Sequence, residues 1–228
     1  MPDLRFEVSA VEAVPFTAAP LLAFKLRIGN APADEPIESI LLRCQVRIDA
    51  ERRRYEPGQQ ARLVELFGAP ERWSRTLRPL LWTSLTVVVP RFAGATEVDL
   101  PVPCSSDLEV TATKLFHGLR GDGGELPLTF LFSGTVFYEG DPGLQVTQIP
   151  WTAEAAFRLP LQTWSDLMDA HHPGRALLSL SRDVVDRLYL YRTRQGLMSW
   201  DQVLDRLLAL ETNGGPVIGP ARGERPAS

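Results

Sequence analysis

The sequence predicts an α+β, mainly β fold: an antiparallel β-sandwich of about eight or nine strands with a C-terminal cap of about three short helices. Three observations support this. Residues 22–28 and 40–48 carry apolar side chains at every second position, which is the period of a half-buried strand. Further apolar runs follow, separated by turns rich in glycine and proline. After Pro160 the apolar period becomes helical.

The two alternating runs are expected to pair with each other as antiparallel strands. Residues 29–36 join them and concentrate Gly, Asn, Pro and Asp, which favour turns. With the apolar side chains facing the core, the intervening cations face outward on neighbouring strands, and these cations are Lys25, Arg27, Arg43 and Arg47. They would form a basic stripe, which could dock an acidic partner, be an ordinary solvated face, or be covered by Glu7, Glu38 and the closing helices.

Apolar runs bounded by turn residues predict the remaining strands. These candidates are residues 4–8, 81–89, 96–102, 108–116, 126–138, 144–149 and 153–159. The run at 126–138 is apolar on both faces, as expected of a central strand, and Gly134 within it predicts a bulge or bend. A short helix near residues 61–68, ended by Gly68, interrupts the series.

Start and stop signals define three helices after the sandwich. The first begins at Thr163 and stops before Pro173, and the second opens at Ser181 and ends at Gly196. The third follows a capping box that starts at Ser199.

These elements predict a domain organisation in three parts. Residues 1–160 form the sandwich with its inserted helix, and residues 161–212 form a helical cap packed on it. Residues 213–228 are too rich in glycine and proline to pack, so we expect a disordered tail.

Composition limits the classes of partner. The chain has 228 residues and a formal net charge of −4, which gives no global attraction to nucleic acid or anionic lipid. No run approaches the length of a membrane helix and no signal peptide is apparent, so we expect a cytoplasmic protein. Of the two cysteines, Cys44 lies among the apolar positions of its strand and reads as buried, whereas Cys104 in a turn could be exposed.

The sequence carries no recognisable catalytic, metal or nucleotide motif, and we expect no cofactor and no metal site. The three histidines, His117, His171 and His172, lack the partners that metal sites require. Should the chain be an enzyme or a small-ligand carrier, its polar groups would be sought first at Asp107, Glu109 and His117. The turn ending at Trp151 is a different candidate, because a tryptophan in a loop can anchor a partner.

Several segments together resemble an uncharacterised bacterial family associated with actinobacterial-type uptake nickel-iron hydrogenase gene clusters. The segments are residues 6–8, 41–48, 65–68, 80–83, 99–104, 130–138, 149–151 and 196–201. The resemblance covers nearly the whole chain apart from the tail, and it carries over no functional residue. It implies an accessory protein that assists assembly or maturation of a large metalloenzyme without itself holding metal.

The leading hypothesis is therefore a non-enzymatic accessory protein that binds another protein, with a hydrogenase subunit or maturation factor as the partner. Its partner-binding residues are expected among Lys25, Arg27, Arg43, Arg47 and Trp151. One alternative is a holdase-like assembly chaperone, which would need a large exposed apolar patch. The other is a small-ligand-binding protein or an enzyme of unknown reaction, which would need an enclosed pocket. The oligomeric state is left open.

Overall fold

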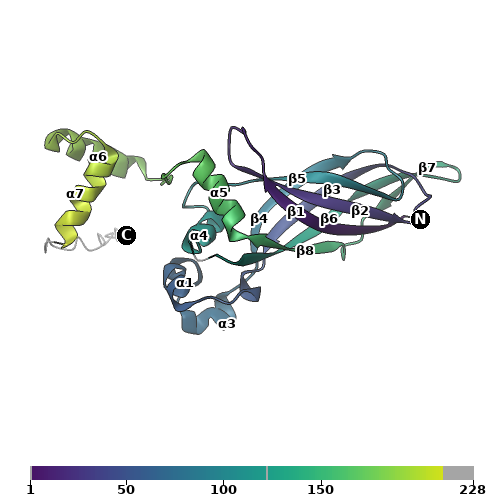
Figure 1. Ribbon diagram of the computed structural model, residues 1–228, viewed down its shortest axis with the longest axis horizontal. Coiled ribbons are helices and arrows are strands. Elements are labelled where there is room, and N and C mark those ends of the chain that lie inside the picture. Colours follow the sequence, from purple (N-terminus) through teal and green to yellow (C-terminus); the bar gives the residue numbers. More distant parts are fainter. Residues whose placement is uncertain (1, 122, 213–228) are drawn as a thin grey trace, which may run out of the picture. The chain divides into compact units, whose positions relative to one another are not determined.

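The structure is a computed structural model that describes residues 2–121 and 123–212. The chain divides into two compact units, Met1–Leu178 and Ser179–Ser228. The first unit contains all eight described strands (Figure 1). The predicted tail, residues 213–228, lies outside the described residues.

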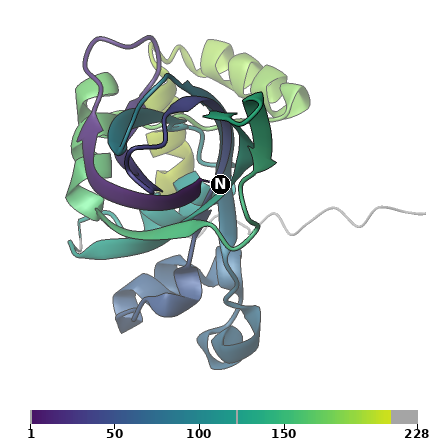
Figure 2. The same ribbon diagram turned by 90° about the vertical axis from the view of Figure 1, so that its right-hand side faces the viewer.

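Eight strands form two antiparallel sheets, which confirms the predicted mainly β class. Sheet A has the order β1-β2-β5, and its strands are β1 Asp3–Ala13, β2 Leu21–Ala31 and β5 Ala95–Pro103. Sheet B has the order β4-β3-β6-β7, with β8 also paired to β6; its strands are β3 Ile37–Ile48, β4 Leu80–Val89, β6 Glu125–Gly140, β7 Gly143–Gln148 and β8 Glu154–Pro160. Both sheets curl around one core (Figure 2).

The expected pairing of residues 22–28 with residues 40–48 is wrong. These runs are β2 and β3, and they lie in different sheets: β2 pairs with β1 and β5, while β3 pairs with β4 and β6. The turn-rich segment between them therefore crosses from one sheet to the other. Each run still alternates as predicted, because a strand buried on one face has the same period whichever strand it pairs with.

The core lies between the inner faces of the two sheets. Phe24 of β2 is fully buried and meets Phe130 of β6 edge to face, with 5.1 Å between ring centroids. Two residues further along β6, Phe132 stacks on Phe6 of β1 with 4.5 Å between ring centroids. Burying a large apolar side chain contributes about 1.5–3 kcal/mol, so these paired aromatic rings are a main attachment of sheet A to sheet B.

Short helices fill the connections of the first unit. They are η1 Ala50–Arg52, α1 Pro57–Arg62, α2 Val64–Phe67, η2 Pro70–Arg72, α3 Trp73–Thr76 and α4 Thr111–Gly118. The helix expected near 61–68 is thus present as α1 and α2, separated at Leu63. The strand expected at 108–116 is wrong: α4 occupies most of it, because the buried residues Ala112, Leu115 and Phe116 follow a helical spacing.

Helix α5, Leu161–His171, closes one end of the sandwich together with α4. Trp164 of α5 stacks on Phe116 of α4 at 4.8 Å and an interplanar angle of 9°. Phe116 in turn lies 5.1 Å from Trp82 of β4. Three rings from three elements therefore seal this end of the core.

The second unit contains α6, Arg182–Gln195, and α7, Trp200–Thr212. As predicted, α6 ends at Gly196, which adopts a left-handed conformation. Half of the predicted capping box is present, since the Gln202 amide donates to Ser199 Oγ at 3.2 Å; the Gln202 side chain reaches back one residue further, where the Met198 amide donates to its Oε1 at 2.8 Å. That these two helices pack on the sandwich stays a prediction.

Gly134 permits the close central pairing of β3 and β6. Its φ is 144°, and a Cβ at this position would lie 2.1 Å from the Leu41 carbonyl oxygen. We expect Gly134→Ala to lower the free energy of unfolding by about 3 kcal/mol or more, since neither backbone can yield without breaking the sheet. Urea denaturation followed by circular dichroism measures this loss. Gly143→Ala is the control, because its φ is also positive, at 76°, but nothing crowds its Cβ; an equal loss there would contradict the steric explanation.

Both cysteines are free and buried, so the expectation that Cys104 could be exposed is wrong. Burial raises the pKa of each thiol to about 12. Because the thiolate is the reactive form, we expect neither cysteine to react with Ellman's reagent at pH 8 in the native protein, and both to react after denaturation. Prompt native labelling of either cysteine would contradict this burial.

Candidate functional site

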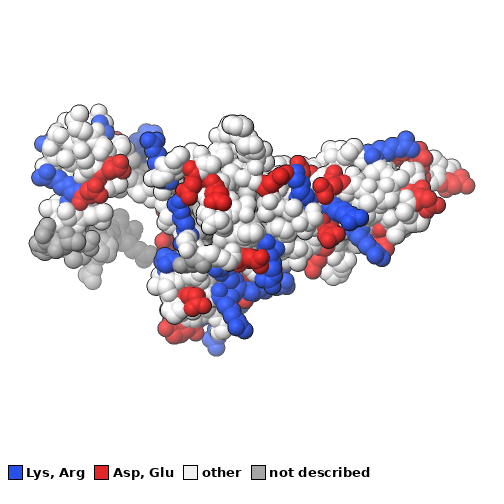
Figure 3. All heavy atoms as spheres, viewed as in Figure 1, with Lys and Arg blue, Asp and Glu red and all other residues white. Residues whose placement is uncertain are grey.

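The outer face of sheet A is covered by charges of both signs. Its acidic members are Asp3, Glu7, Glu12, Glu97 and Asp99, and its basic members are Arg5, Lys25 and Arg27. Figure 3, viewed from the side of β1, shows red and blue side chains interleaved on the sandwich. This face therefore has no continuous basic stripe.

Two of the predicted partner-binding cations, Lys25 and Arg27, lie on this face beside carboxylates. Lys25 Nζ binds Asp99 at 2.8 Å and also pairs with Glu12. The hydrogen bond to Asp99, and to a smaller extent the one to Glu12, raises the pKa of Lys25. Arg27 lies directly between Glu7 and Glu97 in the strand register. The carboxylates on β1 and β5 thus offset the charge that these cations could offer to an acidic partner.

Arg47, on sheet B, is held by a buried carboxylate. Its Nε donates to Asp49 Oδ1 at 3.1 Å, and Asp49 is 1% exposed. Asp49 also accepts a hydrogen bond from Thr129 at 2.6 Å and lies 3.5 Å from Arg52. Arg47 therefore compensates a buried charge, which is a structural role.

Arg43 is the remaining predicted cation, and it lies on the outer face of sheet B between Thr86 and Ser133. Within residues 2–121 and 123–212, no carboxylate lies in ion-pair distance of its guanidinium. The structure thus places Lys25 and Arg27 on one sheet, and Arg43 and Arg47 on the other. Of the four, Lys25 and Arg47 make ion pairs in the described chain and Arg27 lies opposite carboxylates in the strand register, whereas Arg43 has no carboxylate opposite it.

Beside Arg43, the outer face of sheet B carries apolar side chains on four adjacent strands, exposed on β3, β4 and β7 and half-buried on β6. We call this surface the sheet B patch, and its members are Leu41, Val88, Phe137, Leu144 and Val146. Leu41 lies opposite Val88, and Phe137 lies opposite Val146. Val88 is 70% exposed and Leu144 is 62% exposed. Exposed apolar side chains that adjoin one another in this way are typical of interaction sites.

Charged groups border the sheet B patch. Arg43 stands two residues from Leu41 on the same face of β3. At the other border, Arg91 binds Glu38 at 3.1 Å and Glu139 at 3.6 Å. An apolar centre with a polar rim is the usual composition of a protein–protein interface.

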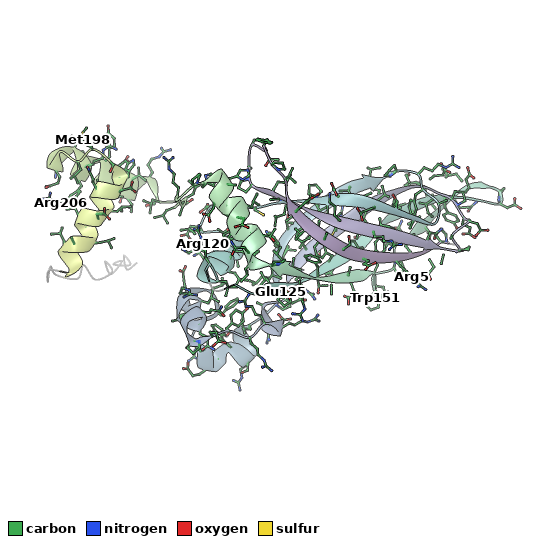
Figure 4. The ribbon with its side chains drawn as sticks, in the orientation of Figure 1. Arg5, Arg120, Glu125, Trp151, Met198 and Arg206 are labelled. Atoms are coloured by element: carbon green, nitrogen blue, oxygen red, sulfur yellow. The ribbon has the colours of Figure 1, made fainter. Side chains whose placement is uncertain are left out.

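Trp151 lies at the edge of sheet B, in the turn between β7 and β8. It is 91% exposed, and Figure 4 shows its side chain pointing away from the sandwich. The strand register explains the turn: β7 and β8 both pair with β6, and residues 150–152 bulge out between them. The prediction that this tryptophan is available to a partner agrees with its exposure, and its binding role stays a prediction.

A surface groove of about 430 Å³ contains two of the three polar residues expected of an enzyme or ligand carrier. Glu109 and His117 line it, and Asp107 accepts a hydrogen bond from the Glu109 amide at 2.9 Å. Lys114 binds Glu65 at 2.5 Å and Glu109 at 3.2 Å. These bonds raise the pKa of Lys114, so its ammonium stays charged and the carboxylates stay paired. A general acid or base needs a pKa near the working pH, so the raised pKa of Lys114 does not suit that role.

Metal-ligating side chains do not gather in the part of the chain that the structure describes: no group of three or more His, Cys, Asp or Glu could hold an ion there. His171 Nδ1 lies 3.1 Å from the Leu167 carbonyl, and its Nε2 lies 3.3 Å from Thr17 Oγ1. Among the same residues, no helix has the length and apolar character needed to cross a membrane.

Residues 1–215 match the model of a family described as "Family of unknown function (DUF6084)". The chain belongs to the DUF6084 family. This confirms the resemblance to an uncharacterised family over nearly the whole chain, and nothing in the match connects the family with hydrogenase clusters.

No curated protein matches this DUF6084 member. Among solved structures, it is similar to β-glucosidase 3B from Thermotoga neapolitana in complexes with α-D-glucose, with glycerol and with glucose. Each match has 13% identity and a TM-score of 0.22, and it covers 69% of this chain and 17% of the glucosidase. The chain thus spans about a sixth of the length of these proteins.

The sheet B patch was missed at the sequence level because its signal is ambiguous. Residues 86–89 of β4 read Thr-Val-Val-Val, which predicts a strand but does not say which face is covered. Residues 144–148 of β7 alternate apolar and polar, so Leu144 and Val146 read as core-facing. In the structure both side chains face outward.

Arg43 and Arg47 should behave differently when each is replaced by alanine. Arg47→Ala leaves the buried Asp49 carboxylate with fewer donors, so we expect a loss of about 1–2 kcal/mol in the free energy of unfolding. Arg43→Ala removes no ion pair and should change stability by no more than about 0.5 kcal/mol. Urea denaturation of the two variants measures the difference. Equal effects would show that Asp49 does not depend on Arg47.

Proposed function

We propose that this chain is a non-enzymatic accessory protein that binds another protein through the sheet B patch. The observation that carries the proposal is the contrast between the two outer faces of the sandwich. Sheet A exposes interleaved charges, whereas sheet B exposes Leu41 beside Val88 and, on β7, Val146 beside Phe137. Since charged residues are depleted at the centres of protein interfaces, sheet B is the face that suits a partner.

Arg43 supports the same proposal because a charge beside an apolar surface makes binding selective for partners of opposite charge. A cation at the border of a patch increases the rate of encounter with an acidic partner and disfavours a basic one. Its guanidinium also has the geometry for two parallel hydrogen bonds to a carboxylate. We therefore expect the partner to present an apolar surface with a carboxylate at its edge.

The partner that we propose is a subunit or maturation factor of a nickel-iron hydrogenase. This identity rests on the sequence resemblance alone, and it makes the chain an assembly factor for a large metalloenzyme. A cytoplasmic location belongs to the same proposal.

Placing a charge in the sheet B patch should remove the partner. We expect affinity-tagged wild-type chain, expressed in its native host, to recover a reproducible partner. Val88→Glu should lower that recovery at least about tenfold, because its carboxylate would be buried in the apolar centre of the interface. Quantitative mass spectrometry of the recovered proteins measures the change.

The matched control is Ala10→Glu, which adds the same charge beside Lys25 on the outer face of sheet A. It should recover the partner as wild type does. Equal recovery with Val88→Glu would reject the sheet B patch as the binding surface. Hydrogenase subunits among the recovered proteins would support the proposed partner, and a reproducible partner of another kind would reject that identity while leaving the binding function intact.

A holdase-like assembly chaperone is the second candidate, and the helices of the second unit favour it. The exposed apolar side chains of these helices and of the loop between them are Val185, Tyr189, Leu190, Met198, Trp200, Leu204, Leu208 and Leu210. A chaperone of this kind would keep an unrelated aggregating protein, such as heated citrate synthase, in solution. A specific accessory protein would not, so light scattering separates the two candidates.

A further inference from the structure

Strand β7 presents an open edge of sheet B. It is the last strand in its sheet, and in the described chain β6 is the one strand that pairs with it. Residues 144–148, Leu-Gln-Val-Thr-Gln, contain no charge and no proline. Such an edge offers a row of unpaired backbone groups to another chain.

The hydrogen-bond pattern identifies which backbone groups point outward from this edge. The Ile149 amide donates to the Gly134 carbonyl at 2.9 Å, so these two opposed residues form a hydrogen-bonded pair. Such pairs alternate along an antiparallel ladder, which makes Thr147 and Gln145 the next residues bonded to β6. The backbone N–H and C=O groups of Leu144, Val146 and Gln148 therefore face the open edge.

The other edges of the sandwich are protected. Charged side chains lie along β1, and β5 carries both charges and prolines. β4 is also uncharged, but it contacts α4 and β5. β8 contacts β1 and carries Arg158 and Glu154. Among the described strands, β7 is thus the edge that has neither charge nor cover.

We propose that two copies of this chain associate by antiparallel pairing of their β7 strands about a two-fold axis at Val146. In this register Leu144 of each copy lies opposite Gln148 of the other, and Val146 lies opposite its own counterpart. All three outward-facing residues of each strand then donate and accept hydrogen bonds. The two copies of sheet B become one continuous sheet.

The charge pattern around β7 fits a second copy of the same strand. An uncharged strand meets no repulsion when it pairs with itself, and a two-fold contact requires a surface of this self-complementary kind. The acidic residues near the hairpin lie at one end of β7, with Asp141 in the turn and Glu139 on β6 opposite Leu144, so the two-fold axis places those of the two copies at opposite ends of the contact. The pairing also joins the two sheet B patches into one surface through Val146. The dimer extends beyond the proposed function, and it forms whether or not another protein binds.

A proline at position 146 tests the backbone pairing. Val146→Pro removes an N–H that faces the open edge, so pairing of β7 with β6 is retained, as for prolines on natural edge strands. Val146→Ala keeps the N–H and shortens the side chain. We expect wild type and Val146→Ala to sediment as dimers in analytical ultracentrifugation, and Val146→Pro to raise the dimer dissociation constant at least about tenfold. Circular dichroism and the melting temperature confirm that both variants are folded.

Charge substitutions test the two-fold register. Because Val146 faces its own counterpart, Val146→Lys and Val146→Glu each place like charges opposite one another, and each variant alone should be monomeric. An equimolar mixture of the two should form a heterodimer, since the opposed charges then attract. Native mass spectrometry distinguishes the three species.

Two results would overturn the proposal. One is a wild-type chain that stays monomeric throughout a concentration series. The other is a dimer that persists unchanged in Val146→Pro. Neither result concerns the partner recovered through Val88, so failure of the dimer and failure of the proposed function can be told apart.

Discussion

Strand β6 pairs with β3 from Tyr138 to Leu128, and every other strand of sheet B is placed by one of these two. β4 lies along β3, while β7 and β8 share the opposite edge of β6. The close approach at Gly134 sets the register of this central pair, because the Leu41 carbonyl leaves no room for a side chain there. A one-residue slip would exchange inner and outer faces, so the same contact keeps Leu41 outward and Leu42 in the core.

The two outer faces follow from how the sequence distributes charge between the sheets. On sheet A, Lys25 is bound by Asp99 and Glu12, and Arg27 lies opposite Glu97 in the strand register, so each cation has a carboxylate on a neighbouring strand. On sheet B, the outward positions are mostly apolar, hydroxyl or amide, and Arg47 is engaged by Asp49. The number of arginines in the chain does not determine whether a given arginine is paired. That depends on which strand lies beside it.

Features set by local sequence could be predicted, and features set by strand partners could not. Alternation in residues 22–28 and 40–48 correctly separates buried from exposed side chains, since burial of one face fixes the period within a single strand. The pairing of those strands depends on residues far away in the chain, and the expected basic stripe failed for that reason. Residues 108–116 were predicted as a strand because short apolar runs suit both structures. In the helix that forms instead, Phe116 stacks on Trp164, a residue far away in the chain. Trp151 was a candidate from its turn alone, and its exposure depends on the register change between β7 and β8.

The open edge of β7 and the sheet B patch are properties of the same few residues. Leu144 and Val146 contribute side chains to the outer face, while their backbone groups face the edge. A single lysine would protect such an edge, and sheet A shows that this chain readily carries charges on its strands. The absence of charge from residues 144–148 therefore matches a strand that has to remain available for pairing. An uncharged edge beside an apolar face would let one short strand serve both proposed contacts, the dimer through its backbone and the partner through its side chains.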